Sequence, residues 1–282
     1  MMRRIKQFFS GIVLGTALLG ASAGHAETLR VAADVGFAPF FMKQANGQID
    51  GYGYDVISAV AKQAGYDGVQ VIDTPFSSVF AGLFSKRFDV IAAPIAIAEN
   101  RAEQILFTEP YIPTGLSMLV KSNTKADDLK DLSGKKIAVN SGSTSEMWVQ
   151  EHMAEYKFEM QRFNKLSDAV QSMLIGRSYA VMSDTPAIRY IAQSQKNTKA
   201  VLHQNSGRNF AYSVRHEEPE LRNRIERALE CLKSTGKLQE IHEKWFGELT
   251  EEDKKIVNGV WPGYGAPGFK GYQDLAHDVV CN

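Results

Sequence analysis

Three segments of the sequence carry residue types that could together hold a small charged molecule. The first, Gly142 to Glu146, reads Gly-Ser-Thr-Ser-Glu and lies between an expected strand and an expected helix. A glycine turn, the hydroxyls of Ser143 and Thr144 and the free N–H groups of a helix start suit a carboxylate or a phosphate. Ser143 and Glu146 also have capping-box spacing, so an ordinary helix cap explains the same residues.

The second segment is an arginine at the end of a buried strand. Arg101 follows the apolar run Val90 to Ala98. Open α/β sheets bind ligands at the carboxyl ends of their strands, and a guanidinium can hold a carboxylate through two parallel hydrogen bonds. The alternative is a surface arginine that pairs with Glu99 or Glu103.

The third group is a pair of aspartates that each follow a predicted strand. Asp184 comes after Tyr179 to Met182, and Asp34 comes after the first strand of the chain. A carboxylate at such a position could hold an ammonium group. For Asp184 the alternative is an N-cap of the helix that begins at Thr185, and Asp34 has the same two interpretations.

Aromatic residues cluster after the strand ends and could form the wall of a pocket. Phe37 and Tyr52 are the candidates, whereas Phe40 and Tyr54 fit an ordinary core better. The histidines of the chain are scattered and form no pair with metal-ligand spacing, so we predict neither a metal site nor a cofactor.

Composition excludes several classes of protein. The chain has 282 residues, with 32 basic and 32 acidic side chains, so nucleic-acid binding is not the default expectation. Hydrophobic residues make up 44%, which is typical of a globular protein. The sequence contains no HExxH, GxGxxG or Walker A motif, which removes support for metalloprotease, dinucleotide and NTPase functions.

The first 26 residues have the pattern of a secretory signal peptide. Arg3, Arg4 and Lys6 precede an apolar stretch that ends in small residues up to Ala26. The apolar stretch is too short to cross a bilayer comfortably. Removal of residues 1–26 leaves 256 residues with a net charge of −3. We therefore expect an exported protein, most simply in a bacterial periplasm.

The periodicity of the remaining chain predicts two sets of alternating strands and helices. The first set has strands at 29–33, 69–72 and 88–93 with helices at 54–64 and 76–83. The second set has strands at 116–120, 136–139, 158–163 and 179–182, with helices at 126–132, 144–156, 168–175 and 185–194. A strand at 210–214, two helices at 218–233 and 238–246, and a Gly- and Pro-rich coil from 247 complete the chain.

Taken together, these segments resemble the extracellular solute-binding proteins of polar amino-acid ABC transporters, bacterial solute-binding protein family 3. The matching motifs are Asp34-Val35-Gly36-Phe37-Ala38-Pro39-Phe40, Gly51-Tyr52-Gly53-Tyr54-Asp55, Asn100-Arg101-Ala102, Phe107-Thr108-Glu109-Pro110-Tyr111, the segment Asp131 to Glu146 and the helix Gly236 to Gly247. The resemblance covers about residues 28 to 247.

The resemblance implies an α/β, two-lobed periplasmic-binding-protein type II fold, with two open sheets joined by two hinge strands. Residues 27–115 and 213–282 would form lobe 1, residues 116–212 would form lobe 2, and residues 248–282 would be a C-terminal tail. The function implied is that of a monomeric periplasmic binding component of an ABC importer. It would take an amino acid or a related amine-bearing carboxylate, close by hinge motion and be recognised by a membrane permease.

The resemblance also assigns roles to the candidate residues. Arg101 would clamp the α-carboxylate of the ligand, with Ser143 and Thr144 beside it, and Asp184 would take the α-ammonium group. Asp34, Phe37 and Tyr52 would contact the ligand side chain.

One position departs from the family pattern. A hydroxyl residue is usual where this chain has Ala96, and Pro94 replaces a small flexible residue. The missing hydroxyl removes one hydrogen bond to the ligand head group, worth about 1 kcal/mol, although the backbone can still contribute.

Two other functions remain open at this point. The same fold hosts periplasmic dehydratases that resemble cyclohexadienyl dehydratase, in which Asp34, Glu146 or Asp184 could donate the proton that elimination needs. An accessory role beside a periplasmic dehydrogenase is the second alternative, and the tail from Trp261 supports it slightly.

The two cysteines of the chain, Cys231 and Cys281, are predicted to form a disulfide because the compartment is oxidising. The bridge would tie the end of the tail to lobe 1 and would contribute on the order of 4 kcal/mol in the chain-entropy model, less any strain. The alternative is a buried Cys231 with a free Cys281.

Overall fold

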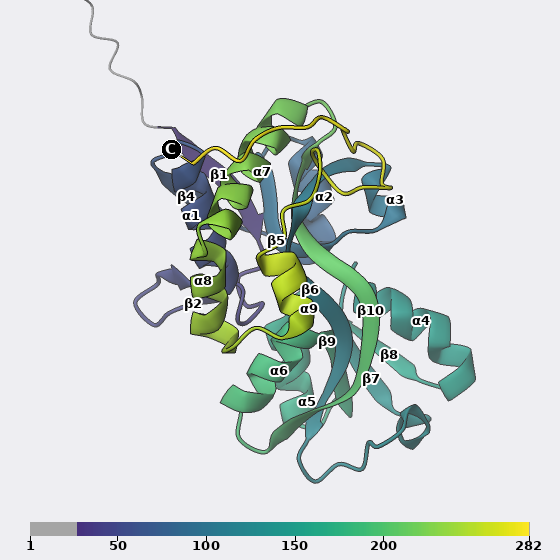
Figure 1. Cartoon of the computed structure of the whole chain (residues 1–282). Helices are drawn as coiled ribbons and strands as arrows, with labels where there is room; N and C mark the ends of the chain where they lie inside the picture. Colours follow the sequence, from purple (N-terminus) through teal and green to yellow (C-terminus); the bar gives the residue numbers. More distant parts are fainter. Residues whose placement is uncertain (1–26, 282) are drawn as a thin grey trace, which may run out of the picture.

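The structure, a computed structural model, describes residues 27 to 281. The predicted signal peptide, residues 1–26, lies outside the described residues. Figure 1 shows two lobes connected by two long, bent strands. Within residues 27–281, no helix has the length and apolar character that a membrane crossing requires.

The two connecting strands join the lobes into one hydrogen-bonded sheet. They are β6 (Ile105–Lys121) and β10 (Thr198–Arg215), which pair antiparallel along most of their length. The strand order is β4-β1-β5-β10-β6-β9-β7-β8, so β10 continues the sheet of one lobe and β6 that of the other. The predicted two-lobed α/β fold is confirmed. The predicted lobe boundaries, after residues 115 and 212, fall inside these two strands.

Lobe 1 has a parallel sheet in which β1 lies between β4 and β5. All seven residues of β5 are buried, as its near-continuous apolar sequence predicts for a strand covered on both faces. The elements are β1 (Thr28–Ala33), β2 (Met42–Lys43), β3 (Ile49–Asp50), α1 (Tyr52–Gln63), β4 (Gly68–Asp73), η1 (Phe76–Ser78), α2 (Val79–Phe84), β5 (Val90–Ala96), α3 (Glu99–Ala102), α7 (Pro219–Ser234), α8 (Lys237–Phe246) and α9 (Glu251–Val257).

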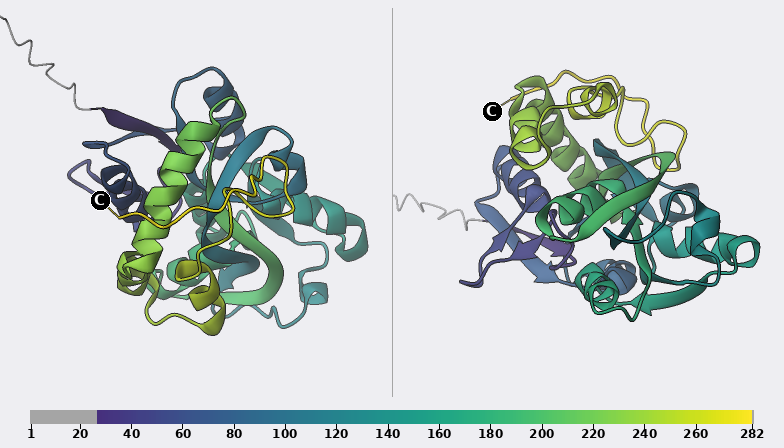
Figure 2. Two further views of the ribbon diagram at one scale, coloured as in Figure 1. Left: turned by 45° about the horizontal axis from the view of Figure 1, so that its top comes forward. Right: turned by 90° about the horizontal axis from the view of Figure 1, so that it is seen from below.

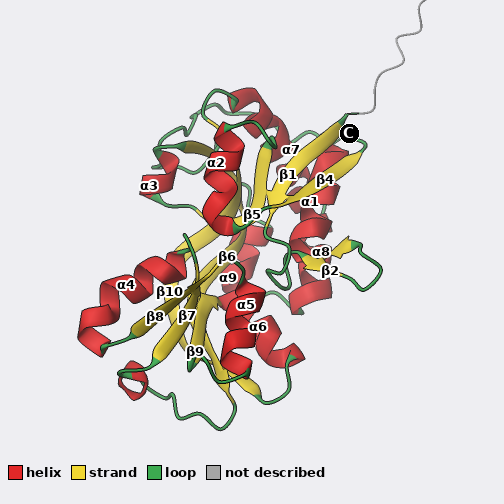
Figure 3. Cartoon of the chain, turned by 180° about the vertical axis from the view of Figure 1, so that it is seen from behind, coloured by secondary structure: helices red, strands yellow, loops and turns green. Residues whose placement is uncertain are grey.

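Lobe 2 repeats the arrangement with a smaller parallel set, in which β7 lies between β8 and β9. Figure 3 shows that the parallel strands of both lobes point their carboxyl ends toward the space between the lobes. The elements are η2 (Leu129–Leu132), β7 (Lys136–Asn140), α4 (Thr144–Tyr156), β8 (Glu159–Phe163), α5 (Leu166–Leu174), β9 (Ala180–Asp184) and α6 (Thr185–Ser194).

Among the segments that differ from the sequence expectation, two matter most for the hinge and the tail. The polar stretch from Thr198 to Asn209 belongs to β10, where register shifts in the pairing with β6 accommodate Gly207 and its neighbours. The expected coil from 247 contains the helix α9. A capping box stabilises the beginning of that helix. The Thr250 hydroxyl accepts the Asp253 N–H at 3.2 Å, and the Asp253 carboxylate accepts the Thr250 N–H at 2.9 Å.

The tail beyond α9 crosses helix α7 and ends beside it, as Figure 2 shows. A disulfide joins Cys231 of α7 to Cys281, with Cα atoms 5.3 Å apart. The predicted disulfide is therefore confirmed in the structure.

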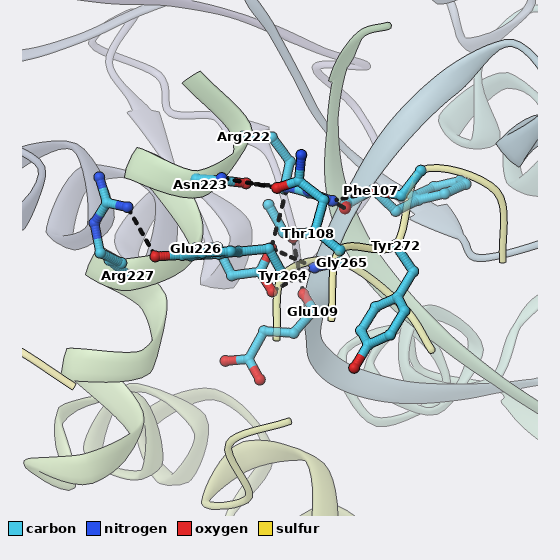
Figure 4. A network of polar contacts seen from close by, with 12 residues as sticks. Phe107, Thr108, Glu109, Arg222, Asn223, Glu226, Arg227, Tyr264, Gly265 and Tyr272 are labelled. Atoms are coloured by element: carbon cyan, nitrogen blue, oxygen red, sulfur yellow. Dashed lines mark hydrogen bonds and ion pairs between the residues drawn. The ribbon is translucent and has the colours of Figure 1, made fainter. Parts of the chain in front are cut away.

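Polar side chains of α7 contact the part of the tail around Tyr264 and Gly265, as Figure 4 shows. The Glu226 carboxylate accepts the N–H of Gly265 at 2.7 Å, and the Arg222 guanidinium donates to the Gly271 carbonyl at 3.2 Å. Glu226 and Arg222 are almost fully buried. Because a buried charge without a partner is expensive, these contacts make the tail an integral part of lobe 1.

We expect the variant Cys281→Ser to unfold more easily than the wild type. Without the bridge the unfolded chain regains the freedom of a loop of 50 residues, which corresponds to about 2–4 kcal/mol. Urea denaturation of the two proteins measures the difference. The wild type with its disulfide reduced serves as the control and should match the variant. Equal free energies of unfolding for variant and oxidised wild type would contradict the expectation.

Candidate functional site

Seven of the eight predicted ligand residues line one cavity between the lobes. They are Asp34, Phe37, Ala96, Arg101, Ser143, Thr144 and Asp184. The cavity lies at the carboxyl ends of β1, β5, β7 and β9. Charged, hydroxyl and aromatic side chains line it together, a combination that suits a small polar ligand.

Arg101 supplies a buried positive charge at one end of the cavity. The residue lies on α3 and is only 6% exposed. Its Nη1 donates to the Ala96 carbonyl at 3.1 Å and its Nη2 to the Gly142 carbonyl of the other lobe at 3.4 Å. Burial lowers the pKa of Arg101 to about 10, which leaves it charged at neutral pH. It forms no ion pair among the described residues, so it can hold an anionic group.

The start of helix α4 faces the same cavity from lobe 2. The Ser143 hydroxyl donates to the Asn140 carbonyl at 2.6 Å and accepts the Glu146 N–H at 3.1 Å, which is the predicted helix cap. The backbone N–H groups of Thr144 and Ser145 have no hydrogen-bond partner among the described residues. The capping and anion-site interpretations are therefore compatible, because the cap leaves two donors free for an anion.

Asp184 is buried at the end of β9 and does not cap the helix that follows. It is the N-cap residue of α6 by position, but its side chain makes no capping hydrogen bond. Instead its Oδ1 accepts the Thr114 hydroxyl at 3.3 Å. Burial raises the pKa of Asp184 to about 6, so the carboxylate is ionised at neutral pH. Its charge is available to a ligand.

Asp34 is the least satisfied polar group of the cavity. It is 1% exposed, and neither carboxylate oxygen has a hydrogen-bond partner among the described residues. The nearest cation, the Lys165 ammonium, lies 4.0 Å away. Burial raises the pKa of Asp34 to about 7. A buried carboxylate in this condition fits a site that a hydrogen-bond donor or a cation completes.

Contacts between the lobes hold the cavity closed. The Lys165 ammonium of lobe 2 lies 2.8 Å from the Asp73 carboxylate of lobe 1, and it donates to the Val35 carbonyl at 3.0 Å. Arg101 adds its hydrogen bond to Gly142 across the same gap. The structure therefore represents the closed arrangement of a two-lobed protein.

Tyr52, the eighth predicted residue, lies outside the cavity. It is fully buried at the start of α1, where its hydroxyl donates to the Tyr111 carbonyl at 3.4 Å. Its ring contacts those of Phe40 and Phe246. The structure thus places Tyr52 in the core of lobe 1, and we exclude it from the proposed site.

Sequence reasoning missed five residues that line the cavity, namely Phe76, Ala93, Pro94, Asn140 and Phe210. Asn140 ends the strand before the Gly-Ser-Thr segment, and this position could have identified it. Phe76 is 5.6 Å from the Arg101 guanidinium and stacks beneath it, which no sequence spacing predicts. Ala96, which lacks the usual hydroxyl, contributes its carbonyl by orienting Arg101.

Comparison with known protein families identifies the family of this chain. The model of the family "Bacterial extracellular solute-binding proteins, family 3" matches residues 29–248. The chain belongs to this family. The predicted resemblance is confirmed, and the match ends just before α9, so the tail lies beyond the family's common region.

Characterised relatives and solved structures agree with this assignment. The arginine-binding extracellular protein ArtP of Bacillus subtilis is 26% identical over 240 residues, covering 84% of this chain and 93% of that protein. An ancestral arginine-binding protein bound to arginine is 35% identical, with a TM-score of 0.74, covering 79% of this chain and all of that one. An ancestral amino acid-binding protein described as a precursor of cyclohexadienyl dehydratase is 30% identical, with a TM-score of 0.71, covering 78% and 95%.

Other relatives are described as arginine-binding or amino-acid-binding proteins of ABC transporters. An amino-acid-binding role in import is therefore the main function supported for this family member. Among residues 27–281, no group of three or more His, Cys, Asp and Glu side chains is arranged to hold a metal ion.

Proposed function

We propose that the protein captures an amino acid with a cationic side chain in the periplasm and delivers it to an ABC permease, without converting it chemically. The cavity offers charges for each part of such a ligand. Arg101 and the free N–H groups at the start of α4 suit its α-carboxylate, and Asp184 suits its α-ammonium group. Asp34 and the aromatic rings of Phe37 and Phe76 suit its side chain.

The observation that carries the proposal is the unpartnered Asp34 carboxylate. Lys165 is engaged with Asp73 and Val35, so it does not neutralise Asp34 fully. A neutral ligand side chain would leave this carboxylate buried and uncompensated, whereas a guanidinium or ammonium group would satisfy both oxygens. The names of the relatives favour arginine among cationic amino acids, because several are described as arginine-binding proteins.

The remaining parts of the proposal follow from the family and the leader sequence. A cleavable signal peptide would export the chain, and the family is extracellular. The closed form would be the species that the permease recognises, and a monomer is sufficient for that role. Incubation with L-arginine should return the ligand unchanged, and formation of a new product would favour the dehydratase alternative instead.

The variant Asp34→Asn tests the assignment of the side-chain site. Loss of one charged hydrogen-bonding partner should weaken binding of L-arginine by about 1.5–3 kcal/mol, or roughly 10- to 100-fold. Binding of L-glutamine, which carries no charge there, should weaken less or improve. Calorimetric titration of both ligands on both proteins measures this. An equal loss for the two amino acids would mean that Asp34 does not select a cation.

The affinity for L-arginine should also depend on pH. The pKa of Asp34 is raised to about 7 by burial, so the free protein holds a proton there below pH 7. A cationic side chain binds the ionised carboxylate, and binding must therefore displace that proton. Affinity should fall by up to about tenfold per pH unit as the pH drops below 7. The variant Asp34→Asn should show a flatter profile, and an unchanged profile would exclude this origin.

A further inference from the structure

A second cavity lies behind the hinge and is larger than the proposed ligand cavity. Its volume is about 560 Å³, and it shares no lining residue with the first. Its walls come from the hinge strand segment Ile112 to Gly115, from α6 and from the chain between α8 and α9. In Figure 1, α9 lies in front of β6 with α6 below it. We refer to this space as the rear cavity.

Both lobes contribute to the rear cavity, so its width depends on the hinge angle. Phe246 and Asp253 line it from lobe 1, while Thr185 and Tyr190 line it from lobe 2. Thr185 directly follows Asp184, which lines the ligand cavity on the other side. A rotation about the hinge that opens the ligand cavity must therefore narrow the rear cavity.

The lobe 1 wall of the rear cavity is acidic. Glu248, Glu251, Glu252 and Asp253 all line it. Glu248 and Glu252 are exposed and form no ion pair among the described residues, whereas Glu251 pairs with Lys254. On the opposite wall, Arg189 is the exposed cation. The balance of charge is negative, and the floor contains Ile112, Pro113 and Phe246, which are apolar.

One buried side chain in this cavity lacks a partner. His242 lines the rear cavity, is 3% exposed, and its Nδ1 has no hydrogen-bond partner among the described residues. Burial lowers the pKa of His242, so the ring is neutral at pH 7. Its Nε2 lies 4.0 Å from the carboxylate of Asp253, which lines the same cavity. The ring centroids of His242 and Phe246 lie 5.2 Å apart, so His242 adds an aromatic surface to this wall of the cavity.

From these features we infer that the rear cavity is a second binding site, for a small organic amine with an apolar body. Glu248 and Glu252 attract the ammonium group, and Phe246 with Ile112 and Pro113 covers the apolar part. This inference does not depend on the identity of the amino acid in the first cavity.

An occupant of the rear cavity should favour the closed form. The cavity is open in the closed arrangement described here and would narrow when the lobes separate. A ligand wedged behind the hinge therefore stabilises closure, and by linkage it tightens binding of the amino acid in front. The amine would act as a positive effector of solute capture.

The probe for the test is 2-phenylethylamine, which lacks the carboxylate that the Arg101 clamp needs. Amide NMR spectra of the mature protein, residues 27–282, should change in a saturable way at Gly115, Gln193 and Glu252. The neutral isostere 2-phenylethanol should bind more weakly. The surface variant E248Q/E252Q should lower the affinity about three- to tenfold, whereas E240Q/E243Q, outside the cavity, should not change it.

Three outcomes would overturn the inference. They are no saturable change up to about 10 mM amine, changes confined to the residues around Asp34 and Arg101, and equal affinities for wild type and E248Q/E252Q. A second titration measures the coupling, because 2-phenylethylamine should tighten binding of L-arginine several-fold. Competition between the two compounds would contradict separate sites. Failure of L-arginine to bind would contradict the proposed function. The NMR titration with 2-phenylethylamine alone would then still test whether the rear cavity binds an amine.

Discussion

The variant Arg101→Ala should lose amino-acid binding while keeping the fold. The guanidinium is buried and carries its charge into the cavity, and within residues 27–281 its hydrogen bonds go only to carbonyl oxygens. Removal of one member of a buried charge pair weakens binding by about 2–5 kcal/mol, or roughly 30- to several thousand-fold. The lost hydrogen bond to Gly142 also weakens closure of the lobes. Calorimetric titration should therefore detect no heat with a ligand that the wild type binds.

Two further variants separate charge from geometry in this experiment. Arg101→Lys keeps the charge but loses the planar fork, so it should bind more weakly than wild type and better than Arg101→Ala. Arg87→Ala removes an exposed arginine outside the cavity and is the matched control. Near-wild-type affinity of Arg101→Ala would show that Arg101 is not the carboxylate clamp.

The second large effect is expected on the free energy of unfolding, when the buried ion pair between Lys233 and Glu109 beneath the tail is broken. The Lys233 ammonium lies 3.0 Å from the Glu109 carboxylate and 2.8 Å from the Gly259 carbonyl, and both charged side chains are fully buried. Glu109 also accepts the N–H of Trp261 at 2.8 Å. The variant Lys233→Met would leave Glu109 buried without its cation. We expect the free energy of unfolding to fall by about 3–5 kcal/mol.

Urea denaturation measures this loss, and a second substitution tests its cause. Burial already raises the pKa of Glu109, so a neutral side chain there should be tolerated better. The double variant Lys233→Met with Glu109→Gln should therefore recover part of the lost stability. Lys237→Met, which removes an exposed ion pair with Glu240, is the control and should change stability by less than about 1 kcal/mol. If Lys233→Met also lowered the free energy of unfolding by less than about 1 kcal/mol, the ion pair would not be needed to hold the tail in place.

The strand-end rule predicted most of the candidate site. Asp34, Arg101 and Asp184 each follow a strand, and parallel strands bring their carboxyl ends to one edge of a sheet. The same argument could not place Tyr52. The Gly-Tyr pattern marks the beginning of α1 but does not determine which way the first side chain of that helix turns, and packing against Phe246 and Tyr111 directs it into the core.

The connection between the lobes was harder to predict. The residues of β10 before Phe210 are polar and partly exposed, and they lack the alternation that identifies a strand. Long-range pairing with β6 makes this segment a strand. Helix α9 was missed for a different reason, because seven residues are too few for a clear helical period, and only the Thr250–Asp253 capping box reveals its beginning.

The anchoring of the tail could not be predicted from sequence periodicity. Arg222, Glu226 and Glu230 recur at four-residue spacing on α7, a pattern that normally indicates a solvent-exposed helix face. The tail covers that face, and its backbone groups and His277 satisfy the charges, as the 2.8 Å contact of His277 with Glu230 illustrates. The cysteine pair was the one feature of the sequence that indicated a docked tail.

The most direct test of the central claim is calorimetric titration of the mature wild-type protein with L-arginine and two truncated analogues. Agmatine lacks the carboxylate proposed to bind Arg101, and 5-guanidinovaleric acid lacks the amine proposed to bind Asp184. L-arginine should bind at one site per chain, and each analogue should bind at least about 30-fold more weakly. Binding of either analogue as tightly as L-arginine, or no binding of L-arginine at all, would contradict the proposed site.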